Sequence, residues 1–180
     1  PKYFAADEVT LITGDVEVAQ AFSQLPFDHL FFTGSTAVGK HIMKAAAQNL
    51  TPVTLELGGK SPVVVTPSAD LAKTVNRVWT GKTMNAGQTC IAPDYVLMQA
   101  DKKHAFIEQS TAWLDAHYPN LADNPDYSFI INPKQASRVQ GYLDEAKQRG
   151  ATLIPLTDYE VNIETGFFPP MIVTDLPSDA

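Results

Sequence analysis

Cysteine is almost absent from this sequence of 180 residues, which contains a single one, Cys90. One cysteine cannot form an internal disulfide, and it excludes a zinc site built from several thiolates. The four histidines are scattered without the spacing of metal ligands, which argues against a metal site of another kind. We therefore expect a cytoplasmic protein, kept in a reducing setting.

Long apolar runs and excess basic charge are also missing. No run reaches the ~18 residues of a membrane-spanning helix, and the first residues lack the apolar core of a secretory signal. The chain carries 13 Lys and Arg against 20 Asp and Glu, a net charge of −7. This acidic balance argues against a nucleic-acid partner, which requires a basic patch. An initiator methionine is absent too, so we expect the sequence to begin part-way through a longer protein.

What the sequence does contain is a regular alternation of short apolar runs with amphipathic segments, and 44% of its residues are hydrophobic. Such alternation is typical of βαβ units and predicts an α/β fold built on a parallel sheet. We expect strands at 9–13, 30–33, 53–57, 63–65, 94–99, 151–156 and 167–176. We expect helices at 16–25, 36–48, 71–84, 102–117 and 133–149.

A glycine-bearing turn follows the second expected strand, in "FTGSTAVGKH". Gly34 to Lys40 fits the spacing G-x-x-x-x-G-K of a phosphate-binding loop, but His41 occupies the position where that motif needs a magnesium-binding hydroxyl. Glycines there still permit a tight strand-to-helix turn, and the helix N-terminus still favours a phosphate. A phosphotransferase with this loop, with Asp70 as its metal ligand, therefore remains an alternative, although Asp70 lies too many residues from its strand.

Cys90 lies in "NAGQTCIAP", a segment rich in turn-forming residues. A lone cysteine in a protein of this class is more often a small buried hydrophobic residue. A cysteine of that kind would sit inside an apolar run, whereas a reactive one needs an accessible thiolate that exposed backbone N–H groups stabilise. The local sequence therefore favours a nucleophile.

Glu56 interrupts the apolar strand "VTLELGG" just before Gly58 and Gly59. Taken alone, it is better explained as the solvent-facing residue of an alternating strand. However, a carboxylate at the C-terminal end of a parallel strand also lies where such folds bind their ligands. A thiol and a carboxylate at different strand ends suit covalent catalysis assisted by a general base.

The segments "FTGSTAVGK", "LELGGKSP" and "NAGQTC", in this order, resemble the aldehyde dehydrogenase superfamily, and the resemblance covers essentially the whole chain. "NLTPVTLELGGKSP" and "CIAPDYVL" are most similar to the branch of coniferyl aldehyde dehydrogenases and class 3 enzymes for fatty and aromatic aldehydes. The resemblance implies a parallel-sheet fold truncated at both ends. Residues 1–57 would be the last part of the NAD(P)-binding domain, and residues 58–180 most of the catalytic domain.

The same resemblance implies roles for six residues. Cys90 would be the nucleophile and Glu56 the general base. The residues implied to contact NAD or NADP are Gly34, Ser35, Gly39 and Leu57, with Ser35 as the phosphate-contacting hydroxyl. Lys40 would then be an ordinary surface lysine.

The implied reaction oxidises a small-molecule aldehyde, aromatic or aliphatic, to its acid through a thiohemiacetal and a thioester. The parent enzyme would be a homodimer or homotetramer. Other parts of the family's site would lie outside this sequence, which we therefore expect to be an inactive internal fragment. A non-catalytic homologue is disfavoured because both Cys90 and Glu56 are present.

Overall fold

A computed structural model describes residues 3–177 of the chain, which divides into two compact units, Pro1–Gly58 and Gly59–Ala180. The division lies one residue from the predicted change of role after Leu57; the roles of the two parts stay predictions. Both units mix helices with short strands, so the predicted α/β class is confirmed. None of the helices in the described part of the chain is long and apolar enough to cross a membrane.

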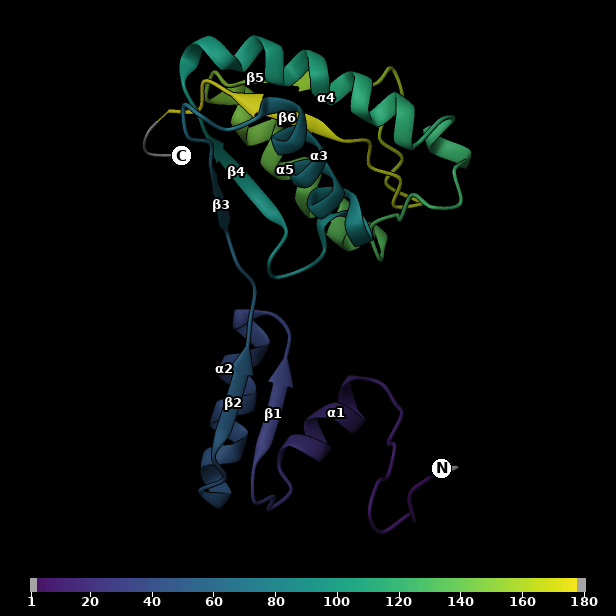
Figure 1. The fold of residues 1–180 in the computed structure, drawn as a ribbon. Coiled ribbons are helices and arrows are strands. Elements are labelled where there is room, and N and C mark those ends of the chain that lie inside the picture. Colours follow the sequence, from purple (N-terminus) through teal and green to yellow (C-terminus); the bar gives the residue numbers. More distant parts are fainter. Residues whose placement is uncertain (1–2, 178–180) are drawn as a thin grey trace. The chain divides into compact units, whose positions relative to one another are not determined.

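The first unit is built on one pair of parallel strands, which a helix connects along the chain (Figure 1). Leu30 pairs with Val53 and Thr33 with Glu56, so the strands end together at their carboxyl ends. The unit contains α1 (Val16–Ser23), β1 (Leu30–Thr33), α2 (Thr36–Ala46), the 3-10 turn η1 (Ala47–Asn49) and β2 (Val53–Glu56). The predicted strand–helix–strand order of this region is confirmed.

The strand predicted at 9–13 does not form, which corrects the sequence reading. The backbone there is irregular, and the N–H of Val9 donates to the carbonyl of Ala5 at 3.0 Å. A strand is stable only where a neighbouring strand satisfies its backbone groups, and among the described residues this segment has no such neighbour. Leu11 and Ile12 instead stay exposed beside an open apolar hollow of about 860 Å³ within the first unit.

The second unit holds two further strand pairs and three long helices (Figure 1). β3 and β4 are parallel and are connected through α3, as the sequence predicts. The elements are β3 (Ser61–Val64), α3 (Leu71–Thr83), η2 (Met84–Gly87), β4 (Pro93–Leu97), η3 (Ala100–Lys102), α4 (Lys103–His117), η4 (Leu121–Asp123), α5 (Pro133–Gln148), β5 (Thr152–Pro155) and β6 (Met171–Thr174). The helices begin and end within two residues of the predicted bounds.

β5 and β6 are antiparallel, whereas the strand–helix alternation predicts parallel strands throughout. The segment that connects them, residues 156–170, contains no helix. A parallel connection needs a crossover, usually a helix, so a chain without one returns in the opposite direction.

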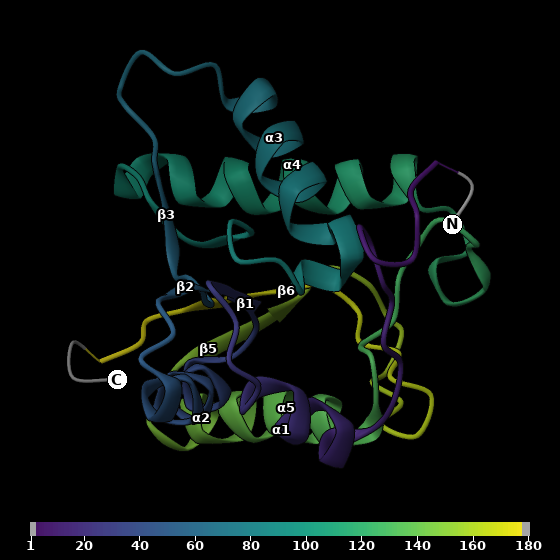
Figure 2. The same cartoon turned by 90° about the horizontal axis from the view of Figure 1, so that it is seen from below.

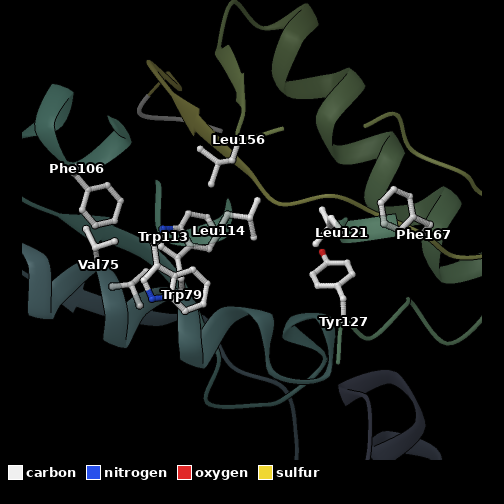
Figure 3. Close-up of a cluster of buried hydrophobic side chains, with 10 residues drawn as sticks. Val75, Trp79, Phe106, Trp113, Leu114, Leu121, Tyr127, Leu156 and Phe167 are labelled. Atoms are coloured by element: carbon white, nitrogen blue, oxygen red, sulfur yellow. The ribbon is translucent and has the colours of Figure 1, made fainter. Parts of the chain in front are cut away.

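The hydrophobic core of the second unit lies between α3, α4 and the strands, and α5 lies on the other side of β5 and β6 (Figure 2). Trp79, Trp113 and Leu114 form its centre (Figure 3). An aromatic group continues the core toward the segment 127–131, where Tyr127 packs edge-on against Tyr118 and Phe167 at centroid distances of 5.4 and 6.1 Å. This packing anchors the segment 127–131, which contacts the loop that carries Cys90.

Candidate active site

Five of the six predicted site residues come together in the first unit, at the carboxyl end of its strand pair. Glu56 is the last residue of β2 and is exposed. Gly34 follows β1, and its N–H donates to the Glu56 carbonyl at 3.0 Å, which extends the ladder by one bond. The register of the two strands therefore places the Gly34 turn beside Glu56.

Ser35 ends the turn and caps α2. Its Oγ accepts a hydrogen bond from the N–H of Val38 at 3.3 Å, so α2 starts directly after the strand. The first N–H groups of this eleven-residue helix face the carboxyl end of the strands, which is a favourable place for an anion. The predicted strand–turn–helix geometry is confirmed. Lys40 is exposed on α2, as expected for a surface lysine.

Gly39 and Leu57 meet behind this turn. Gly39 is buried in the first turn of α2, and a Cβ there would stand 2.9 Å from Cδ2 of Leu57. The absence of a side chain at position 39 lets Leu57 lie against the helix directly after Glu56. Thus Gly34, Ser35, Gly39, Glu56 and Leu57 occupy one neighbourhood.

Cys90 belongs to the second unit, where it lies between η2 and β4 and is exposed to solvent. The turn that precedes it is left-handed over three residues: Asn85, Ala86 and Gly87 have φ angles of 52°, 53° and 73°. Cys90 is therefore presented on an irregular loop and not inside an apolar run, as the sequence predicts. Cys90 therefore belongs to the second unit, whereas Glu56 and the four predicted cofactor residues belong to the first.

Gly59 lies against the backbone of the Cys90 loop. This contact was not predicted from the sequence. A Cβ on Gly59 would overlap the carbonyl oxygen of Cys90, so only glycine fits there. Beside it, Lys60 Nζ forms an ion pair with the Asp94 carboxylate at 2.9 Å, which joins the starts of β3 and β4. The paired glycines of "LELGGK" are the signal that could have indicated this close approach.

Lys82, in the last turn of α3, lies beside the turn that precedes Cys90. Burial lowers the pKa of Lys82; the Asp94 carboxylate raises it and Lys60 lowers it further. The stem of Lys82 lies against Gly87, where a Cβ would stand 3.4 Å from both Cδ and Cε. Within residues 3–177, no group of three or more His, Cys, Asp or Glu side chains is arranged to hold a metal ion.

Comparisons of the sequence and of the structure with known proteins both find aldehyde dehydrogenases. Residues 4–180 match the aldehyde dehydrogenase family. A probable coniferyl aldehyde dehydrogenase of Pseudomonas aeruginosa is 54% identical over 155 residues, which cover 86% of this chain and 33% of that protein. Aldehyde dehydrogenase family 3 member A2 of Macaca fascicularis is 40% identical over 177 residues, 98% of this chain and 35% of that protein.

Solved structures agree in fold. The substrate-bound state of Staphylococcus aureus AldH superposes with a TM-score of 0.85 at 36% identity, over 99% of this chain and 38% of that one. This chain spans about a third of the length of the curated relatives it matches. The recognition made from the three sequence motifs is confirmed, and the chain belongs to the aldehyde dehydrogenase family.

Proposed function

We propose that Cys90 and Glu56 are the nucleophile and the general base of a full-length enzyme that oxidises an aldehyde to its carboxylic acid with NAD or NADP. Homology supports aldehyde oxidation, because the matching relatives are named as aldehyde dehydrogenases. The observation that carries the assignment of the nucleophile is the setting of Cys90: an exposed thiol that follows a left-handed turn, with its carbonyl against Gly59.

Chain connectivity supports pairing this thiol with Glu56. Consecutive Cα atoms are about 3.8 Å apart, so the Cα atoms of Glu56 and Gly59 are separated by at most about 11 Å. Gly59 in turn touches the Cys90 carbonyl. The three-residue connection thus tethers the backbone of Glu56 to the glycine that contacts the nucleophile loop, which supports a shared role of Glu56 and Cys90 in the reaction.

The residues of the first unit fit a dinucleotide. The start of α2 offers backbone N–H groups and the Ser35 hydroxyl to a phosphate, and the bare backbone of Gly34 leaves the turn exposed. A methyl group at Gly39 would displace Leu57 from its place behind the turn. We propose that Gly34, Ser35, Gly39 and Leu57 hold the cofactor, which supplies a hydride acceptor when bound. An aldehyde dehydrogenase of Mycobacterium tuberculosis is described in complex with NAD+ and a relative from Bacillus halodurans with NADP, so the proposal includes both.

The chemistry of the chain's own residues follows from their types. The Cys90 thiolate adds to the aldehyde carbon and forms a thiohemiacetal, whose oxyanion the backbone N–H of Cys90 can stabilise. Oxidation of this adduct leaves a thioester on Cys90. Glu56 then removes a proton from water, which attacks the thioester, releases the acid and frees the thiolate. The names of the relatives favour a coniferyl-type aromatic aldehyde as substrate.

Replacing the nucleophile tests the proposal. In the full-length protein, Cys90→Ser should lower kcat for benzaldehyde and coniferaldehyde by on the order of 10³-fold or more while NAD(P) still binds, because a neutral hydroxyl is a far weaker nucleophile than a thiolate. Turnover of Cys90→Ser close to that of the wild type would refute the assignment.

The isolated chain is proposed to lack this activity, since it spans only about a third of its relatives' length. Catalysis depends on preorganised donors and on a cofactor held in a defined orientation. Titration of the purified chain with NAD and NADP, followed by an assay with both aldehydes, should give neither saturation in the micromolar range nor NADH.

A further inference from the structure

The turn before Cys90 has an unfavourable backbone geometry that something must hold in place. Asn85 and Ala86 both adopt left-handed conformations, with φ angles of 52° and 53°. Such conformations cost non-glycine residues on the order of 1 kcal/mol or more each, and they persist only where the surrounding contacts determine them. The side chain of Gln88, two residues before Cys90, makes these contacts.

Gln88 first closes the turn on itself. Its backbone N–H and its side-chain Nε2 both donate to the carbonyl oxygen of Asn85, at 3.0 and 2.9 Å. In return, Nδ2 of Asn85 donates to the carbonyl of Gln88 at 3.4 Å. Two residues therefore bridge the left-handed turn from both ends.

The same carboxamide also ties the turn to a distant segment. Nε2 of Gln88 donates to the carbonyl of Phe129 at 3.2 Å, and the N–H of Ile131 donates to Oε1 of Gln88 at 3.0 Å. The side-chain amide of Gln88 thus pairs with the carbonyl of Phe129 and the N–H of Ile131, two residues apart. The backbone of a neighbouring strand would make the same pair of hydrogen bonds. This pairing requires both functions of the amide, because Glu lacks the donor and Met lacks both.

The segment that receives Gln88 is itself anchored. The N–H of Ile130, between the two residues that Gln88 contacts, donates to the carbonyl of Gly166 at 2.8 Å. The Phe129 ring packs edge-on against Phe167 at a centroid distance of 5.3 Å. Tyr127 OH donates to the carbonyl of Phe168 at 2.7 Å. Gln88 therefore links the nucleophile loop to a segment that hydrogen bonds and ring contacts hold against residues 166–168.

We propose that Gln88 is a positioning residue for the nucleophile: its carboxamide clamps the left-handed turn 85–87 to the segment 129–131 and so fixes where the Cys90 thiol is presented. The proposal rests on the role proposed for Cys90. It assigns to Gln88 no contact with substrate or cofactor. Misplacement of a reacting atom by about 1 Å can cost on the order of 10²-fold in rate, so a loosened clamp should affect the chemical step.

Two substitutions of Gln88 in the full-length protein test the clamp. Gln88→Met keeps the length and removes both hydrogen-bonding functions, and Gln88→Glu places a carboxylate against two carbonyl oxygens. Gln148→Glu is the matched control, because Gln148 is exposed on α5 and away from this loop. Gln88 is also exposed and outside the hydrophobic core, so both variants should fold, which thermal melts followed by circular dichroism will show.

The readouts separate positioning from general destabilisation. We expect kcat to fall on the order of 10-fold or more in both Gln88 variants, with KM for NAD(P) within about twofold of the wild type. Alkylation of Cys90 by iodoacetamide, followed by mass spectrometry of the Cys90 peptide, should change in rate by about threefold or more, because the released loop no longer presents the thiol in one fixed position. Gln148→Glu should match the wild type in both.

A folded Gln88→Met variant with wild-type kcat and alkylation rate would overturn the proposal. If that variant does not fold, Gln88→Glu decides by the same two measurements. Failure of both variants to fold would show that Gln88 is needed for folding, which would also overturn a positioning role. Should Cys90→Ser stay active, the proposed nucleophile would be wrong, whereas the alkylation rates would still report whether Gln88 holds the loop.

Discussion

The backbone of Gly59 lies against the carbonyl oxygen of Cys90, so that no side chain fits at position 59. Gly58, the preceding residue, is different: a Cβ there would meet nothing within 4 Å. Position 59 therefore has no space for a side chain, whereas position 58 does, and substitutions can measure this difference.

Gly59→Ala should destabilise the protein by about 1–3 kcal/mol, because the new methyl group must push away a backbone carbonyl that has no free space. Gly58→Ala is the matched control and should change the free energy of unfolding by less than about 0.5 kcal/mol. Urea denaturation followed by fluorescence measures both. Equal stabilities of the two variants would mean that the Cys90 loop yields easily.

Glu56→Gln keeps the shape of the side chain and removes the proton acceptor. If Glu56 acts mainly in hydrolysis of the thioester, the variant should still produce one equivalent of NADH per site in a rapid burst, followed by slow steady-state turnover. Stopped-flow absorbance of the full-length protein resolves the two phases. Steady-state turnover equal to that of the wild type would leave Glu56 with a structural role.

Substitution by valine at two threonines near the Cys90 loop should have different effects on the free energy of unfolding. The buried Thr83 hydroxyl donates to the Trp79 carbonyl at 2.7 Å and pairs with Tyr118 OH at 3.0 Å, so Thr83→Val should cost about 1–2 kcal/mol. Among the described residues, the buried Thr89 hydroxyl has no hydrogen-bond partner. Thr89→Val should therefore be neutral or stabilising by up to about 1 kcal/mol. Thermal or urea unfolding distinguishes the two variants, and a larger loss for Thr89→Val would contradict the assignment.

The stability of the protein should depend on Lys82 in alkaline solution. Burial lowers the pKa of Lys82 below its ordinary value of 10.5. Between the folded and unfolded pKa values the unfolded chain binds more protons than the folded chain, so the free energy of unfolding rises with pH across that interval. Lys82→Met removes this rise and keeps the stem against Gly87. Urea midpoints of both proteins from pH 7 to pH 10.5 should therefore shift in favour of the wild type as the pH increases. A constant difference would show that Lys82 titrates alike in both states.

Local patterns in the sequence predict most of the helices, because a helix satisfies its own backbone groups. α4 and α5 begin and end within one residue of the expected bounds. The turn from Gly34 to Ser35 and the position of Glu56 beside it were predictable for a related reason: parallel strands in a βαβ unit end at the same edge. The position of the Gly34 turn beside Glu56 therefore follows from local sequence and one rule of topology, whereas the proposed cofactor roles follow from the family resemblance.

Features that depend on distant partners were not predictable in this way. The segment 9–13 is apolar enough for a strand, but pairing needs a neighbour, and the apolar pattern does not report whether one is present. The antiparallel direction of β5 and β6 depends on a connection without a helix. Gln88 contacts residues 41 and 43 positions further along the chain, and these contacts leave no local signal. Gly59 contacts Cys90 across 31 positions, and its paired glycines indicate a close approach of the backbone without identifying the partner.

The single exposed thiol also makes this chain suitable for site-specific labelling. Cys90 is the only cysteine among the 180 residues, so a maleimide dye or spin label attaches at one position without any prior mutagenesis. A label there reports on the left-handed turn by its emission or its line shape. This signal reports changes of the turn and does not depend on turnover.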